Sequence, residues 1–174
     1  MLNSALEINN FNTIYLKSLI DILKKMGAKL KVSKNSIKVS KGSKLKSTSL
    51  STSPYPGFPT DLQAQLMSLM CISDGKSKIK ETIFENRFMH VPELNRLGAN
   101  ITVEKDTATI IGNQTFKGAQ VMASDLRASI SLVLAAMNAN GQTTLNRVYH
   151  LDRGYENIEK TLGSLGAKIK RQKN

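Results

Sequence analysis

The sequence repeats one short pattern three times, and this repeat restricts the folds open to the chain more than any other feature. Each copy reads as the end of a helix, a glycine and an alternating run typical of a strand: LKKMGAKLKV, LNRLGANITV and LGSLGAKIKR. The copies end at Val32, Val103 and Arg171, and are therefore 71 and 68 residues apart. Such spacing indicates one supersecondary unit that recurs. Three glycines suit the left-handed position that ends a helix, namely Gly27, Gly98 and Gly166.

A second motif repeats between these copies, as PTDLQA at 59–64 and ASDLRA at 123–128. In both, a hydroxyl residue can cap a helix, and an aspartate in the first turn interacts favourably with the helix dipole. The helices that follow are apolar on nearly all sides, which indicates burial. Gly75 and Gly141 end them, and strand-like runs follow at 78–84 and 143–149.

Together the two motifs define a unit of buried helix, strand, amphipathic helix, strand and hairpin strand. We predict an α/β (α+β) fold of βαβαββ-like units, arranged with pseudo-threefold symmetry, with helices inside and sheets outside. The prediction is a single domain over 1–174, with a partial first repeat in 1–50, a second in 51–115 and a third in 116–174. The first copy is expected to begin at its amphipathic helix near Ile14, and the third to stop after one strand of its hairpin.

The chain is basic, with 25 Lys+Arg against 13 Asp+Glu and a formal net charge of +12. Nucleic-acid binding is one interpretation of such a charge. A solvated lysine-rich face is favoured instead, because only six of the basic residues are arginine and few aromatic rings lie among the lysines. In 14–26 the lysines also fall off the apolar stripe of the predicted helix. We therefore expect no nucleic-acid partner.

The 174 residues, 40% of them hydrophobic, are typical of one globular domain. The longest apolar stretch, 132–137, is far shorter than the roughly 20 residues that span a bilayer. Residues 1–10 have neither the basic nor the apolar region of a secretory signal. We expect a cytoplasmic protein without a membrane partner. One cysteine and two distant histidines form neither a disulfide nor a plausible metal site, so we expect no metal and no cofactor.

Four longer stretches carry a family resemblance. They are SPYPGFPTDLQAQ (53–65), ETIFENRFMHVPELNRLGA (81–99), ASDLRAS (123–129) and YHLDRGYE (149–156). These stretches resemble the UDP-N-acetylglucosamine 1-carboxyvinyltransferases, which are enolpyruvyl transferases. The resemblance runs from about Ile14 to the end of the chain and keeps the four motifs in order.

The resemblance implies transfer of the enolpyruvyl group of phosphoenolpyruvate to UDP-N-acetylglucosamine, with release of phosphate. It implies a cleft between two domains of inside-out αβ barrel type, of which this chain is similar to the C-terminal part. The family's glycine-rich loop with a catalytic cysteine and its Lys-Asn pair have no counterpart here, and Cys71 lies in an apolar helix instead. The alternative is an incomplete half that needs a separate N-terminal piece or only binds the UDP-sugar.

Asp61 is the first candidate site residue. From its position alone, it is an acid that helps to cap a helix. The resemblance implies that it binds the sugar nucleotide and acts as general base, because the proton of a weakly nucleophilic sugar hydroxyl must be removed as the new bond forms.

Three candidates lie at the end of the predicted strand at 78–84 or just after it. Ile83 and Phe84 are either core residues or, as the resemblance implies, contacts to the nucleotide sugar. Arg87 is either a substrate-binding residue or the partner of a surface ion pair with Glu85 or Glu81.

Arg127 and Arg153 are expected at helix starts, where free backbone N–H groups already favour anions. A guanidinium adds a planar fork for phosphate or carboxylate, and phosphoenolpyruvate carries both groups. The resemblance implies that both arginines line the phosphoenolpyruvate side of the cleft; the alternative is pairing with Asp125 and Asp152. Asp125 itself is either a helix cap or a residue that orients the reacting groups. The two histidines, His90 and His150, are expected to be structural.

Overall fold

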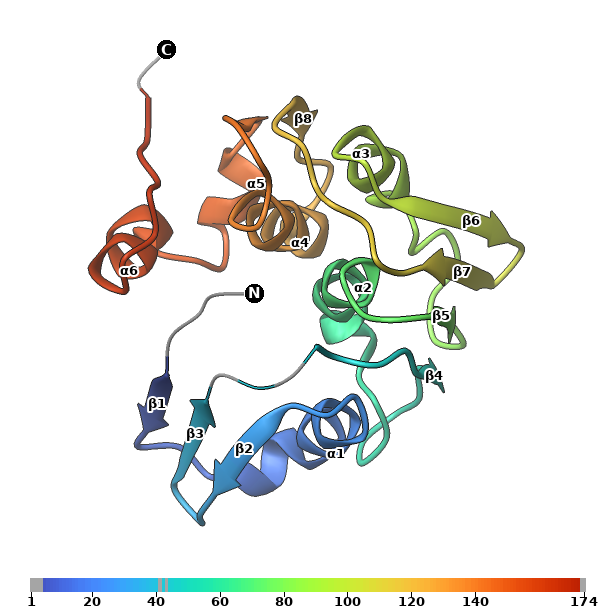
Figure 1. Cartoon of the computed structure of the whole chain (residues 1–174), viewed down its shortest axis with the longest axis vertical. Coiled ribbons are helices and arrows are strands. Elements are labelled where there is room, and N and C mark those ends of the chain that lie inside the picture. The colour runs from blue at the N-terminus through green and yellow to red at the C-terminus, as the bar shows by residue number, and fades with distance from the viewer. Residues whose placement is uncertain (1–4, 41, 43, 173–174) are drawn as a thin grey trace.

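The computed structural model describes residues 5–40, 42 and 44–172 (Figure 1). The first copy of the repeat forms an antiparallel sheet and one helix. Its elements are β1 (Leu6–Asn9), the 3-10 helix η1 (Thr13–Leu16), α1 (Lys17–Lys25), β2 (Lys29–Val32) and β3 (Ser36–Ser40), with strand order β1-β3-β2. As predicted, α1 is amphipathic: Ile20 is buried, whereas Lys17, Lys24 and Lys25 are exposed.

One expectation for this copy is wrong, because it begins a strand earlier than its amphipathic helix. β1 occupies the place that β5 takes in the second copy, 71 residues later, and each pairs antiparallel with the second strand of the following hairpin. The run Leu6–Asn9 alternates apolar and polar residues over only four positions, the shortest length that indicates a strand, so its signal in the sequence is weak.

The second copy is complete and has the predicted βαβαββ order. Its elements are β4 (Ser49–Ser51), η2 (Thr60–Leu62), α2 (Gln63–Cys71), β5 (Lys76–Lys80), α3 (Val91–Arg96), β6 (Asn100–Glu104) and β7 (Thr107–Ile111). The sheet has the order β4-β5-β7-β6, in which β4 and β5 are parallel and the other pairs antiparallel.

The third copy consists of β8 (Gln120–Met122), α4 (Leu126–Ala136), β9 (Thr144–Asn146), α5 (Tyr149–Asp152) and α6 (Ile158–Ser164). β8 and β9 form a parallel pair. The strand expected after Gly166 is absent from the described residues 167–172. That segment has no neighbouring strand to receive its backbone hydrogen bonds, and a lone extended run has no ladder to hold it.

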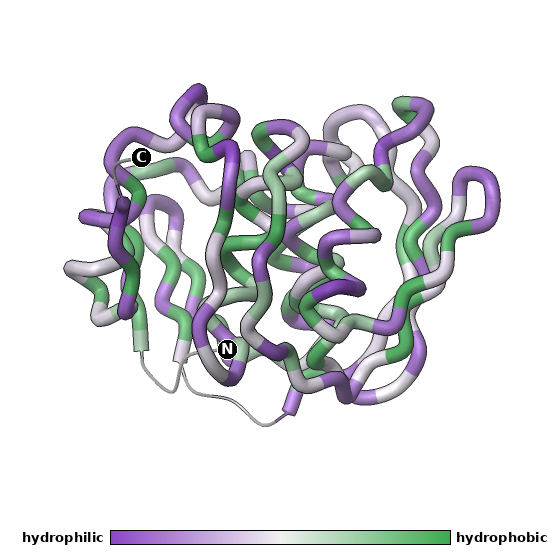
Figure 2. Tube along the Cα trace, turned by 90° about the horizontal axis from the view of Figure 1, so that it is seen from above, coloured by the Kyte–Doolittle hydropathy of each residue, from purple (hydrophilic) through white to green (hydrophobic). Residues whose placement is uncertain are grey.

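α2 and α4 pack against each other in the middle of the molecule, and the sheets lie outside them (Figure 1). Ser68 Oγ of α2 donates to the backbone carbonyl of Ser131 in α4 at 2.9 Å. Met67, Met70 and Leu132 from these helices are almost completely buried in the main core. Figure 2 shows apolar segments along these central helices and more polar segments on the outer turns. The predicted arrangement of inner helices and outer sheets is thus confirmed.

The three glycines that follow the amphipathic helices all have the predicted positive φ, between 93° and 98°. None of the helices in the described part of the chain is long and apolar enough to cross a membrane.

The described chain supplies two inner helices for three sheets, and the sheet of the first copy has an uncovered strand. Ile79 of β5 faces α2 and is 0% exposed, whereas Ile8, at the same place in β1, is 46% exposed. Leu6 is exposed on the same face of β1. An apolar face that is buried in one copy of the unit is therefore open in the other.

Candidate active site

Asp61, Arg87 and Arg127 meet at one point between the two central helices. Asp61 lies in η2, directly before α2, Arg127 is in the first turn of α4, and Arg87 lies in the turn between β5 and α3. Oδ1 of Asp61 accepts a hydrogen bond from Nη2 of Arg87 at 3.1 Å and a second from Nε of Arg127. One carboxylate oxygen therefore bridges two guanidinium groups from separate parts of the chain.

These contacts keep the Asp61 carboxylate ionised. The hydrogen bond from Arg127 lowers the pKa of Asp61 most, and the positive charges of Arg127 and Arg87 add to this, while partial burial opposes it. The same hydrogen bond raises the pKa of Arg127. The side chain of Asp61 remains 59% exposed, so a ligand can reach it from solvent.

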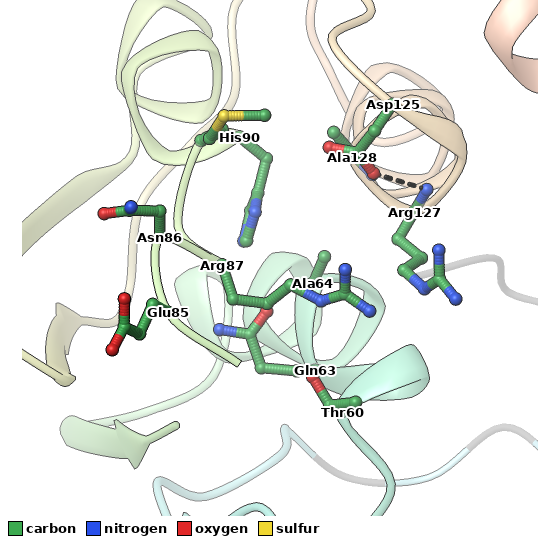
Figure 3. Close-up of a pocket in the computed structure, with 11 residues that line it drawn as sticks. Thr60, Gln63, Ala64, Glu85, Asn86, Arg87, His90, Asp125, Arg127 and Ala128 are labelled. Atoms are coloured by element: carbon green, nitrogen blue, oxygen red, sulfur yellow. Dashed lines mark hydrogen bonds between the residues drawn. The ribbon is translucent and has the colours of Figure 1, made fainter. Parts of the chain in front are cut away.

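A pocket of about 290 Å³ opens beside this ion pair (Figure 3). Its walls come from the start of α2, the turn after β5 and the start of α4. It is lined by Thr60, Gln63, Ala64, Glu85, Asn86, Arg87, Met89, His90, Asp125, Arg127 and Ala128. The structure thus brings four of the predicted site residues to one place: Asp61, Arg87, Asp125 and Arg127.

Asp125 caps α4. Its Oδ1 accepts hydrogen bonds from the backbone N–H groups of Arg127 at 2.8 Å and Ala128 at 3.0 Å, and Ser124 Oγ donates to Oδ2 at 3.2 Å. Burial alone would raise the pKa of Asp125, but these hydrogen bonds hold it below its usual value. Of the two interpretations left open by the sequence, the cap is the one that these contacts support.

The ion pairs suggested for the arginines as structural alternatives do not form. Arg127 contacts the carboxylate of Asp61, not that of Asp125. Arg87 also pairs with Asp61, and not with Glu85 or Glu81. Both arginines line the pocket and share the Asp61 carboxylate.

Arg153 does not join the pocket. It is exposed at the end of α5, not at the start of a helix as expected, because α6 begins only at Ile158. The carboxylate of the neighbouring Asp152 pairs with Arg171 instead, with nitrogen–oxygen distances of 2.6 and 2.9 Å. α6 begins 67 residues after the start of α3 at Val91, close to the 68-residue interval of the repeat, so the expected helix start at Arg153 was five residues too early.

Ile83 and Phe84 lie on the turn that carries Arg87. Ile83 is half-buried, and Phe84 is 55% exposed, so Phe84 is not a core residue. The guanidinium carbon of Arg87 lies 4.8 Å from the centre of the Phe84 ring, which is a cation–π contact. Phe84 thus helps to hold Arg87 and still presents an aromatic surface next to the pocket mouth.

Glu81 is a residue of this region that sequence reasoning missed. It is 4% exposed, and its carboxylate accepts hydrogen bonds from Thr52 Oγ1 at 2.8 Å and Thr60 Oγ1 at 2.9 Å. It also accepts from the backbone N–H groups of Ile83 at 2.9 Å and Phe84 at 3.3 Å. One buried carboxylate thereby ties Thr52, which directly follows β4, to the start of η2 and to the turn. Nothing in the local sequence distinguishes Glu81 from the exposed Glu85.

The other candidates take no part in this pocket, apart from His90. Cys71 is completely buried, and burial raises the pKa of its thiol to about 12, so it is unreactive at neutral pH. His150 stacks on Tyr149 with ring centres 4.2 Å apart and lies outside the pocket. Among the described residues, no group of three His, Cys, Asp or Glu side chains could hold a metal ion.

Comparison with known sequences shows one family throughout. A sequence profile of EPSP synthase (3-phosphoshikimate 1-carboxyvinyltransferase) matches residues 1–162. Proteins named UDP-N-acetylglucosamine 1-carboxyvinyltransferase from Pelagibacter ubique and Azorhizobium caulinodans are 55% and 56% identical to the chain over 166 and 157 residues. The matches cover 95% and 90% of this chain but 40% and 37% of the two relatives. The chain thus spans about two fifths of the length of these relatives.

Comparison with solved structures gives the same fold. The enolpyruvyl transferase NikO from Streptomyces tendae matches with a TM-score of 0.88 at 30% identity, over 97% of this chain and 40% of its own. EPSP synthase from Acinetobacter baumannii matches with a TM-score of 0.75 over 100% of this chain and 41% of its own. At 16% identity, this second match shows the fold alone.

Proposed function

Because the chain belongs to the EPSP synthase family of enolpyruvyl transferases, we propose that it forms one part of a UDP-N-acetylglucosamine 1-carboxyvinyltransferase. The proposed reaction transfers the enolpyruvyl group of phosphoenolpyruvate to a hydroxyl of UDP-N-acetylglucosamine and releases phosphate. The observation that carries the proposal is the position of Asp61, whose carboxylate bridges Arg87 and Arg127 at the mouth of the pocket.

Asp61 supplies the base that this reaction needs. The hydroxyl oxygen of the sugar bonds to C2 of phosphoenolpyruvate while C3 takes up a proton from water. Phosphate then leaves from C2 as C3 returns a proton to water, which restores the double bond. A sugar hydroxyl is a weak nucleophile, so its proton must pass to a nearby base. Asp61 is ionised at neutral pH, since its pKa is lowered, and its exposed carboxylate can receive that proton.

Arg87 and Arg127 supply positive charge for the phosphoenolpyruvate anion. Each guanidinium has N–H groups beyond the one that contacts Asp61, and two guanidinium groups fit a carboxylate or phosphate. An anionic ligand also competes with Asp61 for these groups. When the ligand takes them over, Asp61 loses the contacts that lower its pKa and becomes a stronger base. The reaction would therefore begin only after the anion is bound.

Two further residues have roles in this proposal. Phe84 presents an exposed ring beside the mouth, and Ile83 lies next to it, which suits contact with the sugar nucleotide. Arg153 lies outside the pocket, so a contact with phosphoenolpyruvate requires a cleft wall that the described residues do not form.

A second candidate function is that of an incomplete half that binds ligand but needs a further piece for turnover. The exposed face of β1 favours it, because α2 covers the equivalent face of β5. We propose that a helix like α2 and α4, supplied by sequence outside this chain, covers Leu6 and Ile8. Burying both side chains stabilises such a complex by about 3 kcal/mol or more.

Both candidates are tested by measuring phosphate release from phosphoenolpyruvate and UDP-N-acetylglucosamine. The chain is assayed alone and together with the part of the Pelagibacter ubique relative that it does not match. Phosphate release only in the mixture supports the second candidate, the incomplete half. Phosphate release by the chain alone contradicts that candidate. If neither sample releases phosphate although the two pieces bind each other, the proposed transfer reaction is wrong for this chain.

An Asp61→Asn variant is the control for both samples. The amide cannot accept the hydroxyl proton, so release must fall with this variant wherever it occurs. Unchanged release with Asp61→Asn would remove Asp61 from the mechanism while leaving the reaction itself in place.

A further inference from the structure

Among the described residues, three buried nitrogen atoms of the pocket find no hydrogen-bond partner. They are Nε2 of Gln63, Nε of Arg87 and Nε2 of His90. Gln63 is 1% exposed and His90 is 2% exposed, so bulk water does not satisfy them. Buried polar groups in folded proteins are nearly always paired, because desolvation without a partner is unfavourable. Three unpaired atoms around one pocket indicate that the pocket is built to contain a polar group.

The three side chains reach the pocket from different directions (Figure 3). Gln63 is the first residue of α2, Arg87 lies in the turn after β5, and His90 directly precedes α3. In the figure, the imidazole of His90 points toward the side chains of Arg87 and Gln63. We call these three residues the pocket floor.

The side chains of the pocket floor fit a ligand group that accepts hydrogen bonds. The Nε–H of an arginine and the amide nitrogen of a glutamine only donate hydrogen bonds, so a shared partner must be an oxygen that accepts them. Among the charged groups around the pocket, the Asp125 carboxylate is engaged by the amides of α4 and Asp61 by two guanidinium groups. Glu85 is exposed. Because the guanidinium groups of Arg87 and Arg127 both line the pocket, an anionic oxygen is the acceptor that fits.

His90 can serve as a neutral donor in this floor. Burial lowers its pKa to about 4; the carboxylate of Asp125 opposes this shift, and the charge of Arg87 adds to it. A neutral imidazole carries one hydrogen, either on Nδ1 or on Nε2. An anionic oxygen requires the hydrogen on Nε2. A trapped water would instead accept from Gln63 and Arg87 and donate to a bare Nε2, so the tautomer separates the two occupants.

We propose that Gln63, Arg87 and His90 form a subsite for an anionic oxygen of the ligand, in which His90 donates from Nε2. The identity of the natural ligand rests on the proposed function, in which phosphoenolpyruvate brings both a carboxylate and a phosphate. The subsite itself rests only on the buried donors. His90 and Gln63 thereby add two uncharged donors behind the two arginines, and they make the pocket sensitive to the position of an oxygen atom as well as to charge.

The test is a nitrogen NMR experiment on the imidazoles of the full chain. Three probes are added in separate titrations: inorganic phosphate, pyruvate as a carboxylate without phosphate, and phosphoenolpyruvate. We expect the Nε2–H tautomer of His90 and a shift of its ring nitrogens with phosphoenolpyruvate and with one of the two smaller anions, which identifies the group bound. His150 has its own signal and should not shift.

Paired variants separate binding from folding. Gln63→Leu removes a floor donor at similar size and should weaken phosphoenolpyruvate binding about tenfold, the change expected for one hydrogen bond to a charged group. Gln65→Leu is the matched control, because Gln65 lies on the same helix with a buried, unpaired side-chain oxygen but does not line the pocket. The affinity of the Gln65→Leu variant for phosphoenolpyruvate should equal that of the parent chain.

Three results would overturn the proposal. One is an Nε2 atom of His90 that carries no hydrogen, because a water and not an anionic oxygen would then occupy the pocket floor. Another is anion binding that Arg127→Ala abolishes but that neither shifts His90 nor responds to Gln63→Leu. The third is no binding of any of the three anions. Because these readouts need no turnover, a failed transfer assay leaves the subsite standing, and a failed subsite leaves the transfer reaction standing.

Discussion

Asp61 and Arg127 are 66 residues apart in the sequence, yet Arg127 Nε donates a hydrogen bond to Asp61 Oδ1. The contact follows from the repeat. Asp61 and Asp125 occupy the same place in the two DLxA motifs, and the helices that these motifs begin pack side by side with their starts at the same end of the molecule. In one copy the aspartate caps its helix, and in the other it contacts an arginine of the neighbouring helix.

Replacing Asp61 by Asn should remove catalysis without unfolding the chain. In the mixture of this chain with the complementary part of a relative, we expect phosphate release to fall by about 100- to 10,000-fold, the usual contribution of a general base. The melting temperature should change little, because the side chain is 59% exposed and exposed ion pairs add little stability. A loss of less than tenfold would contradict the role of Asp61 as base.

Binding of an anion should raise the pKa of Asp61. In the free chain, the hydrogen bond from Arg127 and the charges of both arginines hold this pKa below the usual value of 3.8. A ligand that takes over the guanidinium groups removes these effects. Carbon NMR of the Asp61 carboxyl, recorded from pH 2 to 6 with and without phosphoenolpyruvate, should show the midpoint move upward. No movement, with binding confirmed by another signal, would show that Asp61 keeps its arginines.

Asp125 should stabilise the chain as the cap of α4. Asp125→Ala removes the acceptor for two backbone N–H groups and should lower the free energy of unfolding by about 1 kcal/mol. Asn also caps helices well, so Asp125→Asn should recover most of this stability. Urea denaturation of the three proteins at pH 7 compares them. Equal losses for Ala and Asn would mean that the charge of Asp125, and not its cap, stabilises the fold.

Glu81 should hold the turn that carries Arg87. Glu81→Ala removes the acceptor of four hydrogen bonds, two from threonine hydroxyls and two from backbone amides, and should cost about 3 kcal/mol or more. Glu81→Gln should be far milder. Its amide nitrogen can take the place of Oε2, where the Thr60 hydroxyl rotates to accept instead of donating.

Urea denaturation measures the effect of both Glu81 variants on stability, and titration with phosphoenolpyruvate measures their effect on the pocket. We expect Glu81→Gln to bind nearly as the parent chain does. If Glu81→Gln is as unstable as Glu81→Ala, the turn needs the negative charge of Glu81 and not only its hydrogen bonds.

Much of the fold was predictable from the sequence because it is local and repeated. The glycine after each amphipathic helix marks where that helix ends, and Asp125 caps the inner helix α4, whereas Asp61 contacts Arg127 instead of capping α2. The places where prediction failed are those that depend on partners. β1 alternates over only four residues and is defined by its pairing with β3, and the run after Gly166 is not a strand, since the described chain offers no neighbour with which it could pair.

The site was predictable to the extent that it follows from the motifs. The structure brings Asp61, Arg87 and Arg127 into contact, whereas their role in a reaction stays a proposal. Glu81 and Gln63 were not found, because their importance comes from burial, and burial of a polar residue depends on segments distant in the sequence. Arg153 shows the opposite error: the motif is present, but the helix of this copy starts at Ile158, near the position that the interval from α3 gives, and Arg153 instead follows the four-residue α5.

The stability of the chain should depend on His90 between pH 6.5 and about 4. Burial lowers the pKa of folded His90 to about 4, whereas the unfolded chain has the ordinary value of 6.5. In this window the unfolded chain binds a proton that the folded chain does not, so the free energy of unfolding falls as the pH falls. The contribution is complete above pH 6.5 and amounts to about 3 kcal/mol when lost.

Urea denaturation at pH 7, 6, 5 and 4.5 measures this dependence. The lowered pKa values of Asp61 and Asp125 place their effects mainly below this range, since such groups lose stability only as the pH falls through the acid region. His90→Gln should flatten the curve between pH 6.5 and 4.5 whatever its effect on stability at pH 7, and His150→Gln should leave the slope unchanged. A slope that survives in His90→Gln would mean that His90 is not the group that takes up the proton on unfolding.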